Sequence, residues 1–319
     1  MLIVDCHTHF QGDDPQTVAT LERLELKFLN NLVPERDRAH WRAPQPMYAS
    51  LARDHPKRYA WLSGIELPDF DDAAWADRAI ATIKEDLADG AVGVKFWKNI
   101  GMELRKPDGS FLMVDDAIYT PVFEWLAREG VTVLAHLAEP QACWAAEPVG
   151  YYKNHPEWWM GDKPDHPSHA DIMAARDRVV ASHPKLRFVG AHLGSLEYDV
   201  KEMAWRLDRW PNLALEVGGR FKHLAQQGAR TVREFFSRYR DRLMLGTDKG
   251  LGQPASGLDE ATRAEISAGL ERQYTALREF HETSETAEHW GEKLEGLALP
   301  EDVLELYYYR NAQTWFPGV

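Results

Sequence analysis

The stretch MLIVDCHTHF, residues 1–10, is the segment around which the rest of the sequence can be arranged. Its apolar residues predict a buried β-strand that ends in His7-Thr8-His9. Side chains two positions apart on a strand point to the same face, so the two imidazoles lie about 6–7 Å apart along the chain. Neutral imidazole is a frequent protein ligand of zinc and similar ions. The stretch predicts either half of a metal site or a pair of hydrogen-bonded or exposed histidines.

Length and composition restrict the class of protein. The chain has 319 residues, 12 Trp, 12 Phe, 11 Tyr and a formal net charge of −13, with Lys and Arg scattered along it. A size of this order is common for one α/β barrel domain, and the aromatic content excludes a disordered chain. The charge argues against nucleic acid as a partner, and no apolar run approaches the roughly 20 residues that span a membrane. Met1 leads directly into the first strand without a secretory signal pattern, so we expect a cytoplasmic protein with Cys6 and Cys143 reduced.

Eight apolar runs alternate with helical patterns, which predicts a parallel sheet with covering helices. The predicted strands cover residues 2–9, 27–33, 59–65, 91–97, 131–136, 186–192, 213–217 and 243–248. The predicted helices cover residues 15–26, 71–87, 116–128, 169–182, 198–210 and 231–239, followed by closing helices at 260–281 and 301–312. The pattern is typical of an α/β (β/α)₈ TIM barrel made by a single domain, residues 1–319. An open doubly wound sheet is the alternative, but no glycine-rich phosphate turn follows the first strand.

Metal-ligating and ionisable side chains recur where the predicted strands end. They are His7, His9, Lys95, His136, His192 and Asp248. In a barrel of this kind the carboxyl ends of the strands surround one open mouth, so these six side chains are expected to meet there. Each has a plainer alternative when taken singly: a buried core histidine, a lysine that pairs with Glu139, or an aspartate that caps a loop. Six other histidines lie in predicted helices or loops and are expected at the surface: His40, His55, His183, His223, His281 and His289.

This set of residues resembles the amidohydrolase superfamily of metal-dependent barrels. The shared features are the His-x-His pair on the first strand, histidines on the fifth and sixth strands, and an aspartate on the eighth. More narrowly, the chain looks like the branch that includes aminocarboxymuconate semialdehyde decarboxylase. The segment Ala191-His192-Leu193-Gly194-Ser195 resembles that branch's sixth-strand signature. The closing segments Leu299–Val303 and Tyr309–Ala312 resemble its terminal helices.

The resemblance implies a metal site. It implies that His7, His9, His136 and Asp248 bind a divalent ion, with Zn²⁺ as the default for nitrogen and oxygen ligands. In members with one ion, a histidine at the position of His192 acts on the substrate or the attacking water. In members with two ions, that histidine binds the second ion and a carboxylated lysine at the position of Lys95 bridges the pair. One or two ions per chain therefore remain open, and so does a plain ammonium on Lys95.

The loops above the strand ends are expected to set specificity. Strand alternation predicts that Trp97 points inward with Lys95 and that Lys98 points outward. The long loop of residues 139–167 carries Trp144 and other aromatic residues, which would either hold a substrate or form a surface or subunit contact. Glu139 is a further candidate group near the site. Arg220 follows the seventh strand and could clamp a substrate carboxylate.

Three functions are compatible with these residues. The first is a metal-dependent hydrolase of a small organic amide, lactone or ester, because water bound to such an ion is deprotonated near neutral pH. There, Asp248 would accept the proton of the water, and His192 would polarise the carbonyl group. The second is a non-oxidative, metal-dependent decarboxylase of an unsaturated or aromatic carboxylic acid. The third is a barrel that binds metal without turnover. The expected partner is a small-molecule substrate, and a homo-oligomer is an open expectation.

Overall fold

Parallel strands alternate with helices along the chain, as the apolar runs predict. The structure, a computed structural model, describes residues 1–319, with the side chains of all residues except Tyr151 and Glu157. The strands are β1 (Ile3–Phe10), β2 (Leu26–Asn31), β3 (Tyr59–Gly64), β4 (Ala91–Phe96), β5 (Thr132–Ala135), β6 (Phe188–Gly190), β7 (Leu213–Glu216), β8 (Leu243–Met244) and β9 (Lys249–Leu251). They form one nine-stranded sheet in the order β8-β7-β6-β5-β4-β3-β2-β1-β9.

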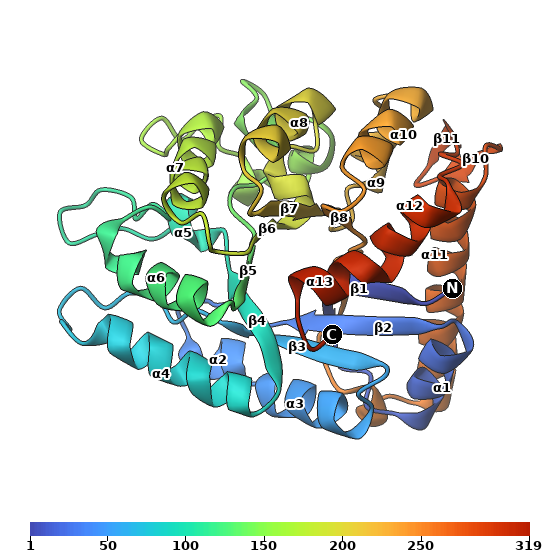
Figure 1. Ribbon diagram of the computed structural model, residues 1–319, viewed down its shortest axis with the longest axis horizontal. Helices are drawn as coiled ribbons and strands as arrows, with labels where there is room; N and C mark the ends of the chain where they lie inside the picture. Colours follow the sequence, from blue (N-terminus) through green and yellow to red (C-terminus); the bar gives the residue numbers. More distant parts are fainter.

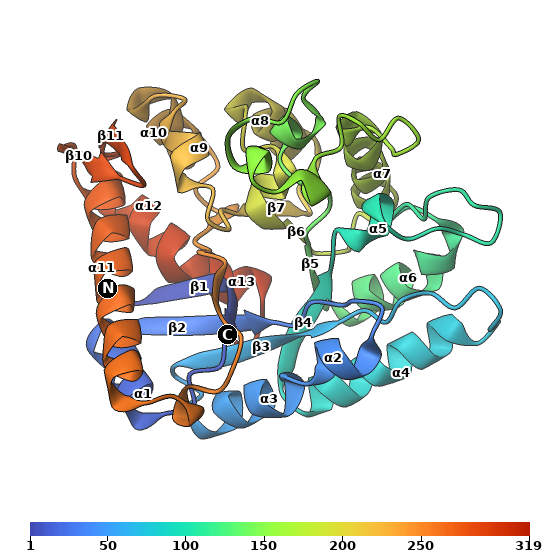
Figure 2. The same ribbon diagram turned by 180° about the vertical axis from the view of Figure 1, so that it is seen from behind.

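The sheet curls so that the segment after β8 returns to β1. Strand β9 pairs in parallel with β1, in the register Thr8 to Lys249. Before that pairing, the backbone N–H of Cys6 donates to the carbonyl of Leu245 at 2.9 Å, and the N–H of Asp248 donates to the carbonyl of His7 at 2.8 Å. The two views of the ribbon show this curl, with the strands at the centre and most helices outside them (Figure 1, Figure 2). The predicted α/β fold is confirmed as a curled, parallel nine-stranded sheet.

Helices follow most strands and begin and end where local chemistry allows. The helices are α1 (Pro15–Arg23), α2 (Arg38–Arg42), α3 (Gln45–Asp54), α4 (Trp75–Ala88), α5 (Asn99–Met102), α6 (Thr120–Glu129), α7 (His169–Ser182), α8 (Val200–Arg209), α9 (Phe221–Ala225), α10 (Ala229–Arg238), α11 (Glu260–Glu282), α12 (Glu301–Glu305) and α13 (Asn311–Trp315). Helix α7 begins with a capping box between Ser168 and Asp171. Helix α6 ends at Gly130, whose φ of 67° suits a residue without a Cβ. No helix among the described residues is long and apolar enough to cross a membrane.

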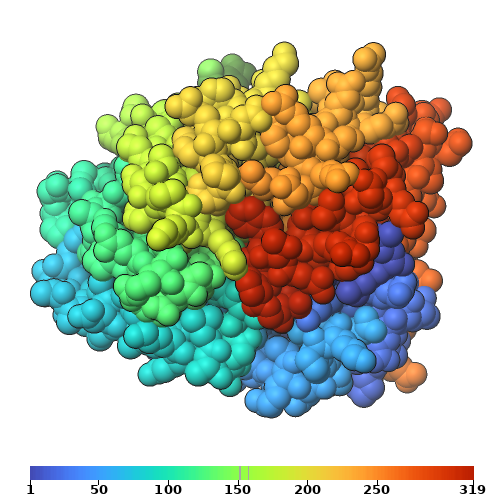
Figure 3. All heavy atoms as spheres, in the orientation of Figure 1, coloured from blue at the N-terminus to red at the C-terminus, as the bar shows by residue number. Residues whose placement is uncertain are grey.

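The C-terminal elements join the two ends of the curled sheet. The N–H of Leu245 donates to the carbonyl of Tyr307, and the Asn311 amide donates to the carbonyls of Arg240 and Leu243. Figure 3 shows these elements, in red, packed against the N-terminal segment in blue and later segments in yellow and orange. Apolar residues from β1, β2, β3, β5, β6, β7 and β8 meet inside the curl, where Trp315 and Phe316 pack against them. The inside is therefore filled by side chains, and the polar groups discussed below lie at the other end of the strands.

Two predicted strands are much shorter than their apolar runs, whereas the others differ by one or two residues at an end. Strand β6 ends at Gly190, and a left-handed turn follows in which His192 has a φ of 54°. Strand β8 ends at Met244, and Asp248 has a φ of 59°. Non-glycine residues seldom adopt a positive φ, so apolar pattern alone extends both strands too far. The two turns set the directions of the His192 and Asp248 side chains, which both belong to the predicted site.

Other differences lie near the C-terminus. A two-stranded hairpin, β10 (Thr286–His289) with β11 (Glu292–Glu295), was not predicted. The predicted closing helix of residues 301–312 is α12, a π-helical turn at Leu306–Arg310, and α13. His281 and His289 are buried, with exposed fractions of 0% and 3%, so the prediction that both lie at the surface is wrong. They face an aromatic group that includes Phe280 and Trp290.

Candidate metal centre

Seven ionisable side chains meet at the carboxyl ends of the strands. Their sources are β1 (His7 and His9), β4 (Lys95), the residue after β5 (His136), the turn after β6 (His192), the end of β7 (Glu216) and the segment between β8 and β9 (Asp248). The six side chains predicted to meet here are thus adjacent to the same end of the sheet. Sequence analysis missed the seventh, Glu216.

His7, His192 and Asp248 form the tightest group. One potential ligand atom from each lies within 4.8 Å of the others. The carboxylate of Asp248 is shared, because its Oδ1 is 3.5 Å from His7 Nε2 and 3.4 Å from His9 Nε2. His136 adjoins the group through His192, at 4.1 Å between ring centroids. His9 and His136, predicted as ligands, therefore lie beside the three-residue group rather than within it.

The orientation of His192 is set by backbone groups. Its Nδ1 lies 2.7 Å from the carbonyl oxygen of Gly218, to which it can only donate a proton. The other ring nitrogen, Nε2, is buried and has no partner among the described residues. A side chain at Gly218 would place its Cβ 2.5 Å from His192 Nδ1, so this glycine permits the close approach. His192 therefore presents an unprotonated nitrogen to the centre of the site.

Glu216 holds two other members of the group. Its Oε1 lies 2.7 Å from His7 Nδ1 and accepts the backbone N–H of His192 at 2.9 Å. The carboxyl group is fully buried, and burial raises its pKa, against the opposing effects of His192 and Lys95. A carboxylate on the far nitrogen of a metal-binding histidine is a common arrangement that fixes the tautomer of the ring. The signal that could have found it is an acid at the end of an apolar strand, Leu213-Ala214-Leu215-Glu216.

Lys95 points into the same group. Its Nζ lies 2.9 Å from His7 Nε2, and the residue is 1% exposed. Burial lowers the pKa of this ammonium to about 8, against the attraction of Glu216 and Asp248. An amine with this pKa is neutral in an appreciable fraction of molecules near neutral pH. Neutral amine is the form that carboxylation by CO₂ requires.

Burial also keeps the imidazoles of the centre neutral. It lowers the pKa of His7, His136 and His192 well below the ordinary value, and nearby cationic or imidazole groups add to the effect. Partial burial would raise the pKa of the Asp248 carboxyl, but His7 and His9 outweigh it and hold that pKa far below its usual range. The side chain of Asp248 is 41% exposed, so the centre meets solvent there.

These residues fit a divalent ion. Neutral imidazoles and an ionised carboxylate are the forms that ligate metal. The Nε2 atoms of His136 and His192 and the Oε2 atom of Glu216 are all buried without a hydrogen-bond partner among the described residues. Buried polar atoms of this kind are uncommon, and an ion is one of the partners that satisfies them. The donor set of nitrogen and oxygen suits zinc or manganese.

Glu139, a predicted group near the site, is paired with Lys98. Glu139 accepts a hydrogen bond from Lys98, whose side chain is 13% exposed, so the prediction that Lys98 points outward is wrong. The alternation of inward and outward side chains does not extend to Lys98, because β4 ends at Phe96. Lys98 also lies over the Trp97 ring, 5.7 Å from its centroid.

Trp144 packs within its own loop. Its indole N–H donates to the carbonyl of Pro167 at 3.1 Å, and its ring meets His169 edge-on. The loop of residues 139–167 contains short 3₁₀ turns at Gln141–Trp144, Gly150–Lys153 and Pro156–Trp158. These contacts favour a structural role for Trp144.

Arg220 lies beside the centre with spare hydrogen-bonding capacity. Its Nε is buried and has no partner among the described residues. Its positive charge contributes to the lowered pKa of His192 and opposes the burial that raises the pKa of Glu197. A guanidinium in this position is placed to bind an anionic group near His192.

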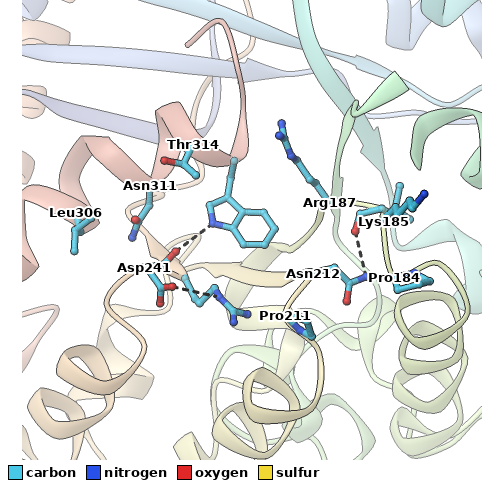
Figure 4. Close-up of a pocket in the computed structure, with 12 residues that line it drawn as sticks. Pro184, Lys185, Arg187, Pro211, Asn212, Asp241, Leu306, Asn311 and Thr314 are labelled. Atoms are coloured by element: carbon cyan, nitrogen blue, oxygen red, sulfur yellow. Dashed lines mark hydrogen bonds and ion pairs between the residues drawn. The ribbon is translucent and has the colours of Figure 1, made fainter. Parts of the chain in front are cut away.

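Two cavities lie at opposite ends of the sheet. One, of about 460 Å³, lies at the amino ends of β6, β7 and β8 (Figure 4). Asn311 and Thr314 form one side of it, and Pro184 and Lys185 lie across from them. The other, of about 360 Å³, has His9 and Asn31 in its wall and therefore adjoins the histidine and aspartate group.

The fold and this group define an α/β protein with a candidate metal centre at the carboxyl ends of parallel strands. The model of the amidohydrolase family matches residues 4–318, so the chain belongs to the amidohydrolase family. This confirms the resemblance drawn from the sequence. Among curated proteins, none is significantly similar in sequence.

Solved structures share the fold at low sequence identity. A dihydroxybenzoic acid decarboxylase from Polaromonas sp. JS666 with bound manganese and the inhibitor 2-nitroresorcinol is 14% identical with a TM-score of 0.57, covering 99% of this chain and 96% of its own. An uncharacterised TIM-barrel protein from Bordetella bronchiseptica is 15% identical with a TM-score of 0.56, covering 100% and 99%. A 4-oxalomesaconate hydratase from Rhodopseudomonas palustris is 11% identical with a TM-score of 0.53, covering 99% and 96%. At these identities the similarity establishes the fold alone.

Proposed function

We propose that this protein is a metal-dependent hydrolase that acts on an amide, lactone or ester of a small organic molecule. The observation that carries the proposal is the group of His7, His192 and Asp248, whose ligand atoms lie within 4.8 Å of one another. The family membership supports an enzyme, and the manganese named for a structural neighbour supports a divalent ion. The proposal includes one (β/α)₈ barrel domain over residues 1–319 with its metal centre at the carboxyl ends of the strands.

The ion would be held by His7 and Asp248 of this group together with His9 and His136, which lie beside it. His192 would act on the substrate or the water if one ion binds, and would become a ligand, with a carboxylated Lys95, if two ions bind. Zn²⁺ is the default choice for this donor set. When bound, such an ion supplies Lewis acidity that activates water near neutral pH and polarises a carbonyl oxygen.

The protein's own residues supply the proton transfers. Asp248 is ionised and partly exposed, so its carboxylate would face an attacking water and accept its proton. His192 presents an unprotonated Nε2, which would accept a hydrogen bond from the water or from a donor of the substrate. In this tautomer it cannot donate to a carbonyl oxygen, so polarisation of the carbonyl would come from the ion alone. Asp248 then returns the proton to the leaving oxygen or nitrogen, so the site ends the cycle in its starting form.

A decarboxylase of an unsaturated or aromatic acid is the second candidate. Arg220 supports it, because a guanidinium with an unpartnered Nε beside His192 suits a substrate carboxylate. A carboxylate held at Arg220 is equally compatible with hydrolysis elsewhere in the same molecule. Lys95 on β4 favours hydrolysis, since a second ion held with the help of this residue would be suited to activating water.

One assay separates the candidates. Protein loaded with Zn²⁺ or Mn²⁺ is incubated with a panel of aryl and alkyl esters, lactones, amides and hydroxybenzoic acids, and both ring or ester opening and CO₂ release are measured. The proposal expects opening without CO₂ release, loss of turnover after chelation, and recovery when metal is returned. Release of CO₂ from an acid with no hydrolysis of any panel member selects the decarboxylase. Retained metal with no turnover of either kind supports a binding protein.

A further inference from the structure

The cavity beside His9 adjoins the candidate metal centre. It lies between the carboxyl ends of β1 and β2 and the helices α2 and α3. Its volume of about 360 Å³ falls within the range of about 300–1,000 Å³ that small-molecule pockets show. The walls include His9, Asn31, Leu32, Trp41, Pro44 and Tyr48.

His9 connects this cavity to the metal centre. Its Nδ1 donates to the carbonyl oxygen of Asn31 at 2.7 Å, and its Nε2 lies 3.4 Å from Asp248 Oδ1. The ring is partly exposed, with 24% of the side chain accessible. A molecule in the cavity therefore lies against the same imidazole that contacts the carboxylate of Asp248.

The apolar walls are already in place. Leu32, Trp41 and Tyr48 are at most 4% exposed and pack together in one apolar cluster. Helix α2, which carries Trp41, is tied to α4 by the paired hydrogen bonds of Arg42 to the buried carboxylate of Asp86, at 2.7 and 3.1 Å. A preformed wall reduces the ordering cost of binding.

The charge of the lining favours an uncharged occupant over an anion. Among its residues, as far as the structure describes them, there is no lysine or arginine, and Glu35 contributes a carboxylate. The free guanidinium nitrogen of the region belongs instead to Arg220, near His192. The two sides of the centre thus differ: one is apolar and weakly acidic, and the other is cationic.

Asn31 adds a polar requirement to the apolar side. It is 1% exposed, and its Oδ1 is buried without a hydrogen-bond partner among the described residues. An unpaired buried carbonyl oxygen costs free energy that a donor from a ligand would recover. A ligand with a hydroxyl or N–H group on an apolar body can satisfy this atom once the Asn31 side chain, which belongs to the cavity wall, turns its amide oxygen toward the cavity.

We propose that this cavity is a specificity pocket that binds the uncharged, apolar end of the substrate, a ring or branched hydrocarbon with a hydroxyl or N–H donor, beside His9. The proposal rests on the proposed function for the identity of its occupant as substrate. It does not depend on which reaction the metal centre catalyses. Under this proposal, the residues of α2 and α3 that line the cavity determine which substrates bind.

The test is the binding of two uncharged probes, benzyl alcohol and benzyl methyl ether, to the metal-loaded protein, followed by ligand-observed NMR. Benzyl alcohol is expected to bind about tenfold more tightly, since the ether lacks the donor for Asn31. Asn31→Leu removes the acceptor and is expected to abolish that difference. Ala43→Phe places a ring at the exposed edge of the cavity and is expected to weaken both probes at least about tenfold, as occupied volume excludes the ligand.

Two further variants separate binding in this pocket from binding elsewhere on the protein. Thr314→Phe fills the cavity at the opposite end of the sheet and is expected to leave both dissociation constants unchanged. Asp248→Asn, which depletes the ion, is expected to keep the binding of benzyl alcohol, whereas a probe that binds the ion itself would be lost. Unchanged binding in Ala43→Phe, or no saturable binding to the wild type, overturns the proposal. If both probes bind as expected but no panel compound is turned over, the proposed function fails and the pocket stands.

Discussion

The Oε1 atom of Glu216 lies 2.7 Å from Nδ1 of His7, and both side chains are at most 1% exposed. A carboxylate at this nitrogen holds the imidazole proton on Nδ1 and leaves Nε2 to face the centre. The same oxygen accepts the backbone N–H of His192, so one carboxyl group positions members from β1 and from the turn after β6. Glu216 is a positioning residue, because it acts on the centre through these two histidines.

Replacing Glu216 tests this arrangement. Glu216→Gln keeps the size of the side chain but removes the charge that fixes His7, so metal affinity is expected to fall about 10–100-fold. The measurement is the dissociation constant for Zn²⁺ by competition with a chromophoric chelator, together with thermal unfolding to confirm the fold. Glu234→Gln, on the exposed surface of α10, is the matched control and is expected to keep wild-type affinity. Equal affinities in the two variants would show that the charge of Glu216 does not contribute to metal binding.

Removal of ligands tests the metal centre itself. His7→Ala or Asp248→Asn is expected to deplete the ion and to abolish activity, because His7 and Asp248 both belong to the group whose ligand atoms lie closest together. Metal content is measured by atomic emission after dialysis, with His40→Ala, an exposed histidine of α2, as the control. A protein that stays fully loaded after the double change His7→Ala/His9→Ala would falsify the assignment.

Much of this centre could be predicted because strand ends are visible in the sequence. His7, Lys95 and Asp248 each close an apolar run, and parallel strands bring such positions to one end of the sheet. Glu216 also closes an apolar run, but it was missed because no motif marked it. The positive φ angles of His192 and Asp248 could not be predicted, since neither residue is glycine and tertiary contacts impose the turns.

The alternation of strand side chains is reliable only within the strand. It placed Lys95 correctly in the interior, where the residue is 1% exposed. It failed for Lys98, because β4 ends two residues earlier and Lys98 turns toward Glu139. Loop contacts of this kind depend on a partner 41 positions away in the chain, which local pattern does not contain.

The number of bound ions tests the role of Lys95. Its pKa of about 8, lowered by burial, makes the neutral amine accessible for reaction with CO₂. We expect the wild type to bind two equivalents of Zn²⁺ in the presence of bicarbonate and Lys95→Met to bind one. Metal stoichiometry in buffers with and without bicarbonate measures this, and the mass of the native protein reports a bound CO₂. One equivalent under all conditions would instead assign Lys95 as an ammonium that orients an anionic substrate.

Arg220 is expected to bind a carboxylate of the substrate. Arg220→Met removes the guanidinium and keeps an apolar stem, so KM for a carboxylate-bearing substrate should rise about ten- to a hundredfold, as expected for a hydrogen bond to a charged group. The corresponding substrate with a methyl ester in place of the carboxylate should be little affected. Steady-state kinetics on the matched pair measure the difference. A similar change in KM for both substrates would show that Arg220 does not recognise the charge.

Acid stability should depend on His281, which is far from the metal centre in the chain and fully buried. Its Nδ1 donates to the Leu277 carbonyl at 2.7 Å, and burial lowers its pKa to about 4 from an ordinary value of 6.5. Because the unfolded chain takes up a proton below pH 6.5 that the folded chain refuses, stability falls as pH drops from about 6.5 to about 4. This difference corresponds to a loss of about 3 kcal/mol in the free energy of unfolding.

The replacement His281→Leu removes the titrating group while keeping an apolar side chain in the aromatic cluster. The free energy of unfolding, measured by urea at about pH 7 and about pH 4.5, is expected to fall less between the two values in His281→Leu than in the wild type, by about 2–3 kcal/mol. His40→Leu, at an exposed position, is expected to follow the wild type. Other histidines contribute in the same direction, since full or partial burial lowers the pKa of His169 and His223 to about 4 as well. The remaining pH dependence of the free energy of unfolding in His281→Leu therefore measures these histidines together with those of the metal centre. A pH dependence equal to that of the wild type would show that His281 takes up its proton without unfolding.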